Sequence, residues 1–297
     1  MMNEELMNQV ILGDSLVELD RIEDKSINLI CIDPPYNIGK DEWDYREDYY
    51  EFMNNIFIKL ESKLKDNGSF FFFHNDFRMM AELDRLVQKN TSFVFRNFIV
   101  WNKRFDGSPK KGFLDGFVVR GGLNSFNKMA EYMMFYTFDN SWKLKEERTK
   151  RNVVQMTMGE EILSRTGGLT GWYSNIEMGK NYPTKETIKP ITKHLGLTID
   201  DIVPKFRNQK KHHSVWNYDL DAKKVGHITP KPVELMENII LHTTDENDVV
   251  LDCFAGAGST AIACKNLNRN FIMIEREKKY CDIIEKKLDL YTKKVVT

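Results

Sequence analysis

The chain has 297 residues, of which 41% are hydrophobic, enough to build one large domain or one domain with an insert. Its N-terminus lacks a basic start followed by an apolar run, and its longest apolar stretches are too short for a bilayer, so neither a signal peptide nor a transmembrane helix is expected. A net charge of −1 gives no global sign of a polyanionic partner.

The first part of the chain alternates apolar strands with helices, as in a parallel sheet that is covered on both faces. A continuous apolar strand at 27–32 is ended by Pro34 and Pro35, which cannot donate to a ladder. In chain order, the pattern predicts a strand at 10–12, helix at 15–22, strand at 27–32, helix at 47–64, turn at Asn67-Gly68, strand at 69–73, helix at 77–88, and strands at 93–101 and 130–138.

The alternation stops between residues 140 and 221, where glycine pairs and short helical pieces replace it. Thr198 and Asp201 have the spacing of a helix capping box. The α/β pattern then resumes with a helix at 232–242, strand at 248–252, helix at 258–266, strand at 270–275 and helix at 278–290. We therefore interpret 140–221 as an insert that divides one α/β domain.

The four cysteines form no CxxC pair and lie in apolar strands and helices. Buried free thiols in a reducing cytoplasm are expected, rather than disulfides or a zinc site. His212 and His213 are interpreted as solvated, because no cysteine or carboxylate cluster accompanies them, and no metal site is predicted.

A glycine-rich turn follows the strand that ends at Asp252. Gly256 and Gly258 allow close approach of the backbone to a ligand, although a purely structural turn is the alternative. Glu275 ends the next strand 19 residues after Gly256, which suits a carboxylate that accepts hydrogen bonds from ribose hydroxyls. The spacing Gly256-x-Gly258-x-Thr260 departs from GxGxxG and favours an adenosine cofactor without a pyrophosphate.

The strand at 27–32 ends in Asp33-Pro34-Pro35-Tyr36. A strand-terminating turn is the simplest interpretation, but a carboxylate at the end of a buried strand is costly unless it is used or paired. In a parallel sheet, this turn and the loop after Asp252 end on the same edge, where ligands bind in open α/β folds. The sequence therefore predicts that the two motifs share one site.

Taken together, these blocks resemble the DPPY-type amino-methylating DNA methyltransferases. The resemblance includes Gly13-Asp14-Ser15, strands at 99–103 and 131–136, and the block at 226–235, and it departs at Cys253 and Ile228, where the family often has proline. The order of motifs is similar to that of the β class. The resemblance implies a doubly wound, mostly parallel, Rossmann-like sheet, with a catalytic half at 1–139, an inserted target-recognition region at 140–221 and a cofactor-binding half at 222–297.

The implied reaction is transfer of a methyl group from S-adenosylmethionine to N6 of adenine. The resemblance implies that the Asp33 carboxylate and the Pro34 carbonyl accept hydrogen bonds from N6. These bonds offset the positive charge that develops on the nitrogen. Pro35 helps to fix the backbone, and Tyr36 stacks on the base after it is flipped out of the duplex. The catalytic residues are therefore predicted to be Asp33, Pro34, Pro35 and Tyr36.

The resemblance also distributes the cofactor contacts. Asp14 is expected near the adenine of S-adenosylmethionine, Glu275 at the ribose, Phe254 with the glycine loop at the methionine part, and Thr229 with Lys231 at its carboxylate. The complete predicted set is Asp14, Thr229, Lys231, Asp252, Phe254, Ala255, Gly256, Gly258, Thr260 and Glu275.

Double-stranded DNA is the expected partner, whereas a homodimer and a cognate restriction endonuclease are left open by the resemblance. Residues 96–128 contain seven basic residues against two acidic ones, which is typical of a solvated loop or of a nucleic-acid contact. The predicted DNA-contacting residues are Lys103, Arg104, Lys110, Lys111, Lys205, Arg207, Lys210 and Lys211.

Three alternatives are weighed. N4-cytosine methylation shares the fold and cofactor, but many such enzymes have serine where this chain has Asp33. A nicotinamide-dependent oxidoreductase is disfavoured by the glycine spacing and by the Asp-Pro-Pro-Tyr motif. A catalytically silent DNA-binding subunit is disfavoured by intact motifs.

Overall fold

The chain folds into two compact units, each of which is described by itself. The computed structural model describes residues 2–39, 44–109, 129–207, 213–220 and 230–295. The larger unit comprises Met1–Lys65, Ser69–Tyr136 and Phe206–Thr297, and the smaller unit comprises Asp66–Gly68 and Thr137–Lys205.

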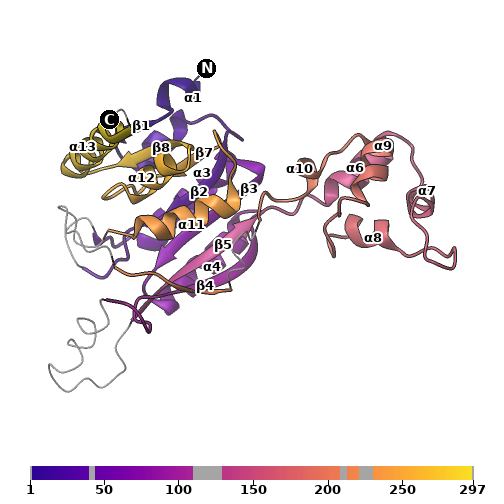
Figure 1. Cartoon of the computed structure of the whole chain (residues 1–297), viewed down its shortest axis with the longest axis horizontal. Helices are drawn as coiled ribbons and strands as arrows, with labels where there is room; N and C mark the ends of the chain where they lie inside the picture. Colours follow the sequence, from indigo (N-terminus) through magenta and orange to yellow (C-terminus); the bar gives the residue numbers. More distant parts are fainter. Residues whose placement is uncertain (1, 40–43, 110–128, 208–212, 221–229, 296–297) are drawn as a thin grey trace. The chain divides into compact units, whose positions relative to one another are not determined.

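In the larger unit, the described strands form one eight-stranded sheet in the order β1-β8-β7-β2-β3-β5-β4-β6 (Figure 1). Strands β1, β8, β7, β2 and β3 pair in parallel, β3 and β5 pair antiparallel, and β4 and β6 pair in parallel. The predicted doubly wound, mostly parallel sheet is therefore confirmed. The bounds are β1 (Gln9–Leu12), β2 (Ile27–Ile32), β3 (Leu64–His74), β4 (Val94–Asn102), β5 (Ala130–Thr137), β6 (Val215–Asn217), β7 (Val249–Asp252) and β8 (Asn270–Glu275).

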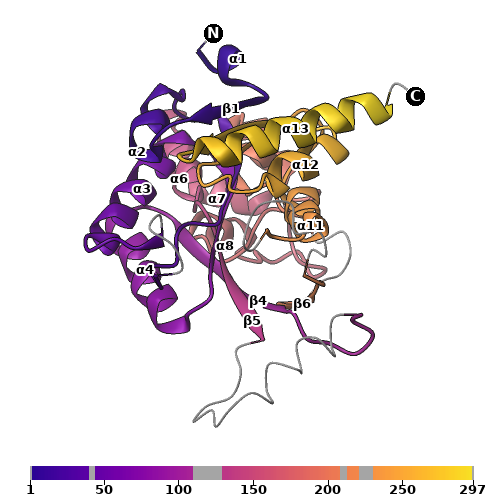
Figure 2. The same ribbon diagram turned by 90° about the vertical axis from the view of Figure 1, so that its left-hand side faces the viewer.

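Helices cover both faces of this sheet. Figure 2 shows α2, α3 and α4 on one side and α11, α12 and α13 on the other. The helix predicted at 15–22 is divided into a short α-helix and a 3-10 helix, η1. The bounds are α1 (Met2–Leu6), α2 (Ser15–Glu18), η1 (Leu19–Arg21), α3 (Tyr49–Lys63), α4 (Phe77–Asn90), α11 (Val233–Thr243), α12 (Ser259–Asn266) and α13 (Lys278–Val295).

The described part of the chain contains no helix that is both long and apolar enough to span a membrane.

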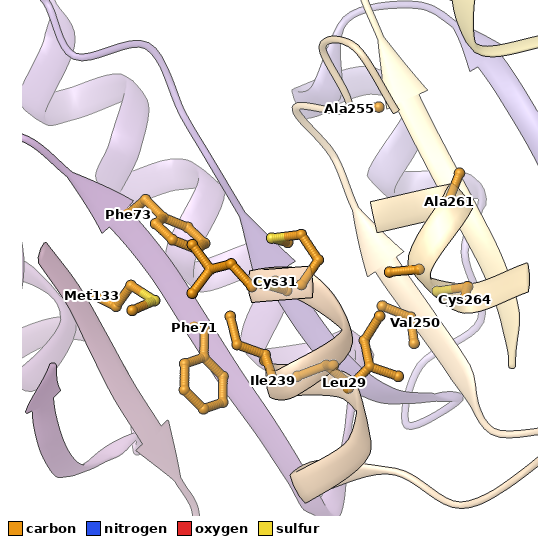
Figure 3. Close-up of a cluster of buried hydrophobic side chains, with 14 of the residues drawn as sticks. Leu29, Cys31, Phe71, Phe73, Met133, Ile239, Val250, Ala255, Ala261 and Cys264 are labelled. Carbon is orange, nitrogen blue, oxygen red and sulfur yellow. The ribbon is translucent and has the colours of Figure 1, made fainter. Parts of the chain in front are cut away.

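The core lies between the central strands and the helices. Leu29 and Cys31 from β2 pack with Phe71 and Phe73 from β3 and with Ile239 from α11 (Figure 3), and each is at most 1% exposed. Full burial of one large apolar side chain stabilises a fold by roughly 1.5–3 kcal/mol, so the centre of the sheet is a firm support for the loops at its edge. All four cysteines are buried free thiols, as predicted.

Strands β2 and β7 are neighbours although they lie more than two hundred residues apart. Leu29 pairs with Val250 and Ile30 with Leu251. The chain passes from β2 to β3 in one direction and from β7 to β8 in the other, so the strand order reverses between them. Ligands bind at the carboxyl ends of strands at such a reversal. The turn after β2 and the glycine loop after β7 thus meet there, as predicted.

The smaller unit is helical, with α6 (Trp142–Lys150), α7 (Gln155–Glu160), α8 (Trp172–Glu177), α9 (Ile188–Leu195) and α10 (Ile199–Ile202). A separate core of Leu144, Met158, Tyr173, Ile191 and Leu195 holds it together. The predicted capping box of Thr198 and Asp201 is present at the start of α10.

Two boundaries differ from the prediction. The insert was expected to reach residue 221, but the chain returns to the larger unit at Phe206, whose ring centroid lies 5.3 Å from that of Phe135. Trp216 of β6 is buried beside β4 and completes that return. The turn expected at Asn67-Gly68 lies instead within β3, where the register against β2 shifts.

Candidate active site

The turn after β2 carries Asp33-Pro34-Pro35-Tyr36 at the carboxyl edge of the sheet. Because neither proline has an N–H group, other hydrogen bonds must hold this turn. The buried carboxylate of Asp44 accepts three, from the backbone N–H groups of Tyr36 (2.7 Å), Asn37 (3.1 Å) and Ile38 (3.0 Å). The sequence did not reveal this role, because a single acid in a polar loop belongs to no recognisable pattern.

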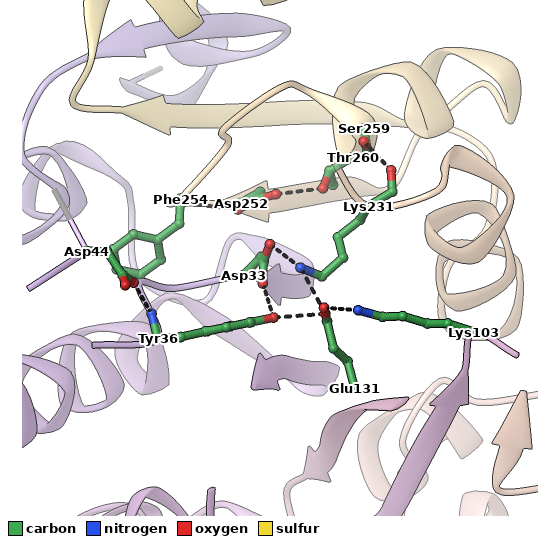
Figure 4. A network of polar contacts seen from close by, with 10 residues as sticks. All are labelled: Asp33, Tyr36, Asp44, Lys103, Glu131, Lys231, Asp252, Phe254, Ser259 and Thr260. Carbon is green, nitrogen blue, oxygen red and sulfur yellow. Dashed lines mark hydrogen bonds and ion pairs between the residues drawn. The ribbon is translucent and has the colours of Figure 1, made fainter. Parts of the chain in front are cut away.

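Five side chains at this edge form one polar network (Figure 4). Lys231 Nζ lies 2.5 Å from Asp33 Oδ2 and 3.2 Å from Glu131 Oε2. The Tyr36 hydroxyl lies 2.6 Å from Asp33 Oδ1 and 3.1 Å from Glu131 Oε2. Lys103 forms a further ion pair with Glu131. Glu131 is a site residue that the sequence analysis missed, although a carboxylate inside an apolar strand is a signal that could have drawn attention to it.

Burial and mutual attraction determine the charges of this network. Burial alone would raise the pKa of Glu131, but the ammonium groups of Lys231 and Lys103 outweigh it and lower that pKa to about 2. Burial alone would lower the pKa of Lys231, but the carboxylates of Asp33 and Glu131 outweigh it and raise that pKa. Glu131 is therefore ionised and Lys231 protonated at neutral pH.

The ring of Tyr36 is fixed on one side by His74, with ring centroids 4.7 Å apart. Burial lowers the pKa of His74 to about 4, so the imidazole is neutral, and its Nδ1 accepts a hydrogen bond from the backbone N–H of Asp76 (2.9 Å). Burial and the two neighbouring carboxylates raise the pKa of Tyr36, which keeps its hydroxyl a neutral donor. That Tyr36 stacks on a substrate base stays a prediction.

Two acids hold the glycine loop between β7 and α12. Asp252 accepts hydrogen bonds from the backbone N–H of Phe254 (3.0 Å) and from the hydroxyl of Thr260 (2.6 Å), and burial raises its pKa to about 7. Glu275, at the end of β8, accepts a hydrogen bond from the backbone N–H of Gly256 (2.8 Å). The loop is thus shaped by the same acids that the sequence singled out.

One cavity brings together most of the predicted catalytic and cofactor-binding residues. Phe52 of α3 also lines it, with Arg46, whose guanidinium lies 4.0 Å from the Phe52 ring centroid; neither has a sequence pattern that marks a site. Thr229 lies outside the described residues. The predicted residues that line the cavity are Asp14, Asp33, Pro34, Pro35, Tyr36, Lys231, Asp252, Phe254, Ala255, Gly256, Thr260 and Glu275.

Gly258 is absent from this lining, and its described contacts explain why it is glycine. It precedes α12 with a φ of 78°, and an added Cβ would lie 2.8 Å from Cγ1 of Ile284. We expect Gly258→Ala to lower the free energy of unfolding by about 1–2 kcal/mol from its backbone alone and further from this contact. Urea unfolding measures the change.

The matched control is Gly107→Ala, because Gly107 also has a positive φ (91°) but no atom within 4 Å of an added Cβ. Gly107→Ala should lower the free energy of unfolding through backbone strain alone, without a contribution from a tight side-chain contact. Equal losses for Gly258→Ala and Gly107→Ala would contradict the tight contact with Ile284.

The contact of Lys103 with DNA stays a prediction, and within the chain this residue already has a partner. Its ammonium is paired with the buried Glu131 and lies 4.8 Å from the ring centroid of Trp101. Lys103 therefore belongs to the polar network, because the attraction of a buried carboxylate holds it there.

The other described candidates lie at the surface or near it. Arg104 is exposed, and Arg207, with its side chain 69% exposed, lies 3.5 Å from a carboxylate oxygen of Asp245. Lys205 belongs to the smaller unit and is half-buried. The remaining candidates, Lys110, Lys111, Lys210 and Lys211, lie outside the described residues.

Comparison with known proteins identifies the relatives of this chain. The sequence model of the N6/N4 methyltransferases, described as DNA methylase, matches residues 27–286. Type II methyltransferase M1.MboII of Moraxella bovis is 32% identical, over 88% of this chain and 89% of its own length. Type II methyltransferase M.HinfI of Haemophilus influenzae is 29% identical, over 96% of this chain and 69% of its own length.

Solved structures share the fold. The M1.HpyAVI–SAM complex superposes with a TM-score of 0.55 at 19% identity, covering 94% of this chain and 98% of that chain. The PvuII DNA methyltransferase, whose title calls it cytosine-N4-specific, gives a TM-score of 0.58 at 15% identity, covering 93% of this chain and 84% of that one. At these identities the likeness concerns the fold alone.

Proposed function

The chain belongs to the DNA methylase family of N6 and N4 methyltransferases, and from that membership we propose that it methylates N6 of a flipped adenine in double-stranded DNA, with S-adenosylmethionine as methyl donor. The observation that carries the proposal is the position of Asp33 beside the glycine loop in one cavity. We further propose that the methylation is site-specific and serves a restriction–modification or phage-protection system, as the type II names of the relatives suggest.

The residues around the cavity fit this methyl donor. Glu275 and Asp14 offer carboxylates for ribose and adenine groups, and the aromatic ring of Phe254 offers apolar contact. Lys231 is one of three cations on the lining, with Arg46 and Arg276, and it offers an ammonium group to a carboxylate. When bound, the donor supplies an electrophilic methyl group on a positively charged sulfur.

The amino group of adenine is a poor nucleophile because its lone pair is delocalised into the ring. Hydrogen bonds from N6 to the Asp33 carboxylate and the Pro34 carbonyl would localise that pair, and a bond to a charged group contributes roughly 1.5–3 kcal/mol. The donor would supply its methyl group to N6 and keep the electron pair of the S–C bond on sulfur, while Asp33 and Pro34 would hold the amino group in place. The methylated nitrogen then releases one proton, which passes through Asp33 to water.

Access to the base requires flipping, because N6 cannot be reached by this site inside a duplex. Asp33 is 27% exposed and can meet an extruded base. We propose that Arg104, Arg207 and Lys205, together with the candidates outside the described residues, contact the DNA.

N4-cytosine methylation is the rival, with the same fold and donor, and the acid at position 33 favours adenine. Duplex DNA incubated with the chain and S-adenosylmethionine carrying a labelled methyl group, then digested to nucleosides for mass spectrometry, separates the two. We expect label on N6-methyladenine. Label only on N4-methylcytosine would overturn the choice of base, and no label in DNA would overturn the reaction.

Sequencing of the methylated positions then identifies the recognition site, and sedimentation tests for a homodimer.

A further inference from the structure

Four charged side chains of alternating sign, of which Lys231 and Glu131 are buried, form a chain that begins at the catalytic motif: Asp33, Lys231, Glu131 and Lys103 (Figure 4). The side chains of Lys231 and Glu131 are 7% and 8% exposed, so water screens them little. The two negative and two positive charges cancel. The network is therefore neutral as it stands, although the reaction develops a positive charge beside Asp33.

Both carboxylate oxygens of Asp33 are engaged in this arrangement. Oδ1 accepts from the Tyr36 hydroxyl, and Oδ2 accepts from Lys231. An amino group that donates to Asp33 must compete with one of these partners. Lys231 is the one that opposes the reaction, because its ammonium repels a second positive charge at the same carboxylate.

The main chain of Lys231 is held on the side of the cavity that the glycine loop forms. Its carbonyl oxygen accepts a hydrogen bond from the hydroxyl of Ser259 (2.6 Å), the first residue of α12 after the glycine loop. Lys231, Ser259 and Asp33 all line the same cavity. A lysine side chain has four rotatable bonds, so its ammonium can exchange partners within this cavity while the backbone stays in place.

We propose that Lys231 is a positioning residue with two partners: it occupies Asp33 when the methyl donor is absent and moves to the donor's carboxylate when the donor binds, which couples donor binding to DNA binding. This inference rests on the proposed function. Without Lys231, the remaining charges of Asp33, Glu131 and Lys103 sum to −1, which favours the positive amino nitrogen. The sulfonium charge of the donor also repels Lys231 from its position beside Asp33.

Binding measurements test this without turnover. The probe is an unmethylated duplex that carries the recognition site found by sequencing the methylated positions. Its affinity for the chain is measured by fluorescence anisotropy, with and without saturating sinefungin. Sinefungin is an unreactive analogue of the donor that keeps the carboxylate and a positive charge. We expect sinefungin to tighten DNA binding about tenfold, within the usual 5- to 150-fold range of such coupling. Methylthioadenosine, which lacks the carboxylate, should leave DNA affinity unchanged.

The variant Lys231→Met keeps an unbranched side chain and removes the charge. It should bind DNA equally with and without sinefungin. The matched control, Lys265→Met, removes an exposed lysine from α12 outside the cavity and should keep the tenfold effect. Full coupling in Lys231→Met would overturn the proposal. If that variant does not fold, the parent chain still decides: equal tightening by methylthioadenosine and sinefungin, or by neither, excludes the exchange.

These outcomes are distinct from failure of the proposed function. A chain that methylates adenine but shows no coupling contradicts only the role of Lys231. A chain that neither methylates nor binds DNA with any ligand contradicts both.

Discussion

Replacing Asp33 by alanine should lower the single-turnover rate of DNA methylation by on the order of 10³-fold. The carboxylate is the negative group nearest to the predicted position of the amino nitrogen, and its effect is realised as charge develops in the transition state. Binding of sinefungin, measured by calorimetry, should be retained or tightened, because Lys231 loses the partner that competes for it. A loss of turnover with donor binding intact separates chemistry from folding.

The control for this substitution is Asp20→Ala. Asp20 is a surface acid with its side chain 66% exposed, paired across the surface with Lys59, and pairs of that kind contribute little. Turnover should stay within about twofold of the parent, as expected for a surface substitution. Near-parental turnover in Asp33→Ala would place the chemistry elsewhere and favour the silent DNA-binding interpretation.

The central sheet could be predicted because local pattern and tertiary environment agree there. All six residues at 27–32 are buried and all but Asn28 are apolar, as expected for a strand covered on both faces. The glycine loop and Glu275 have a spacing that a βαβ unit explains. Sheet topology then placed two distant motifs at one edge without any knowledge of side-chain contacts.

The polar network could not be predicted, because it depends on contacts between residues far apart in sequence. Lys231 reaches Asp33 across 198 residues, and Tyr36 reaches Glu131 across 95. A lysine in a loop is ordinarily solvated, so Lys103 was predicted to contact DNA, and no partner within the chain was expected. Its partner lies on a strand with no pattern that links the two.

The end of the insert was misplaced for a similar reason. Residues 206–220 have a loop-like composition, yet Phe206 and Trp216 pack on the larger unit. Those two aromatic contacts, rather than any regular periodicity, return the chain to the sheet.

Glu131→Gln should lower the free energy of unfolding by about 3–5 kcal/mol, the usual effect of removing one partner from a buried ion pair. The substitution leaves the ammonium groups of Lys231 and Lys103 with Asp33 as the single remaining carboxylate of the network. Urea unfolding measures the loss. The double variant Glu131→Gln/Lys103→Met should recover part of it, because the buried charges then balance again. A double variant less stable than the single one would show that Lys103 stabilises the fold by other contacts.

The difference in unfolding free energy between the parent chain and Glu131→Gln should depend on pH. This dependence tests whether Glu131 is ionised in the folded chain. Burial opposes ionisation, but Lys231 and Lys103 lower the folded-state pKa from the usual 4.5 to about 2. A carboxyl group whose pKa is lower in the folded chain stabilises the fold while it is ionised. For Glu131 this stabilisation is roughly 3 kcal/mol above about pH 4.5, and it is lost as the pH falls toward 2. Glutamine does not titrate, so the gap in unfolding free energy between parent and Glu131→Gln should narrow between pH 5 and pH 3. A gap that stays constant over this range would mean that the folded chain does not hold Glu131 as a carboxylate between its two lysines.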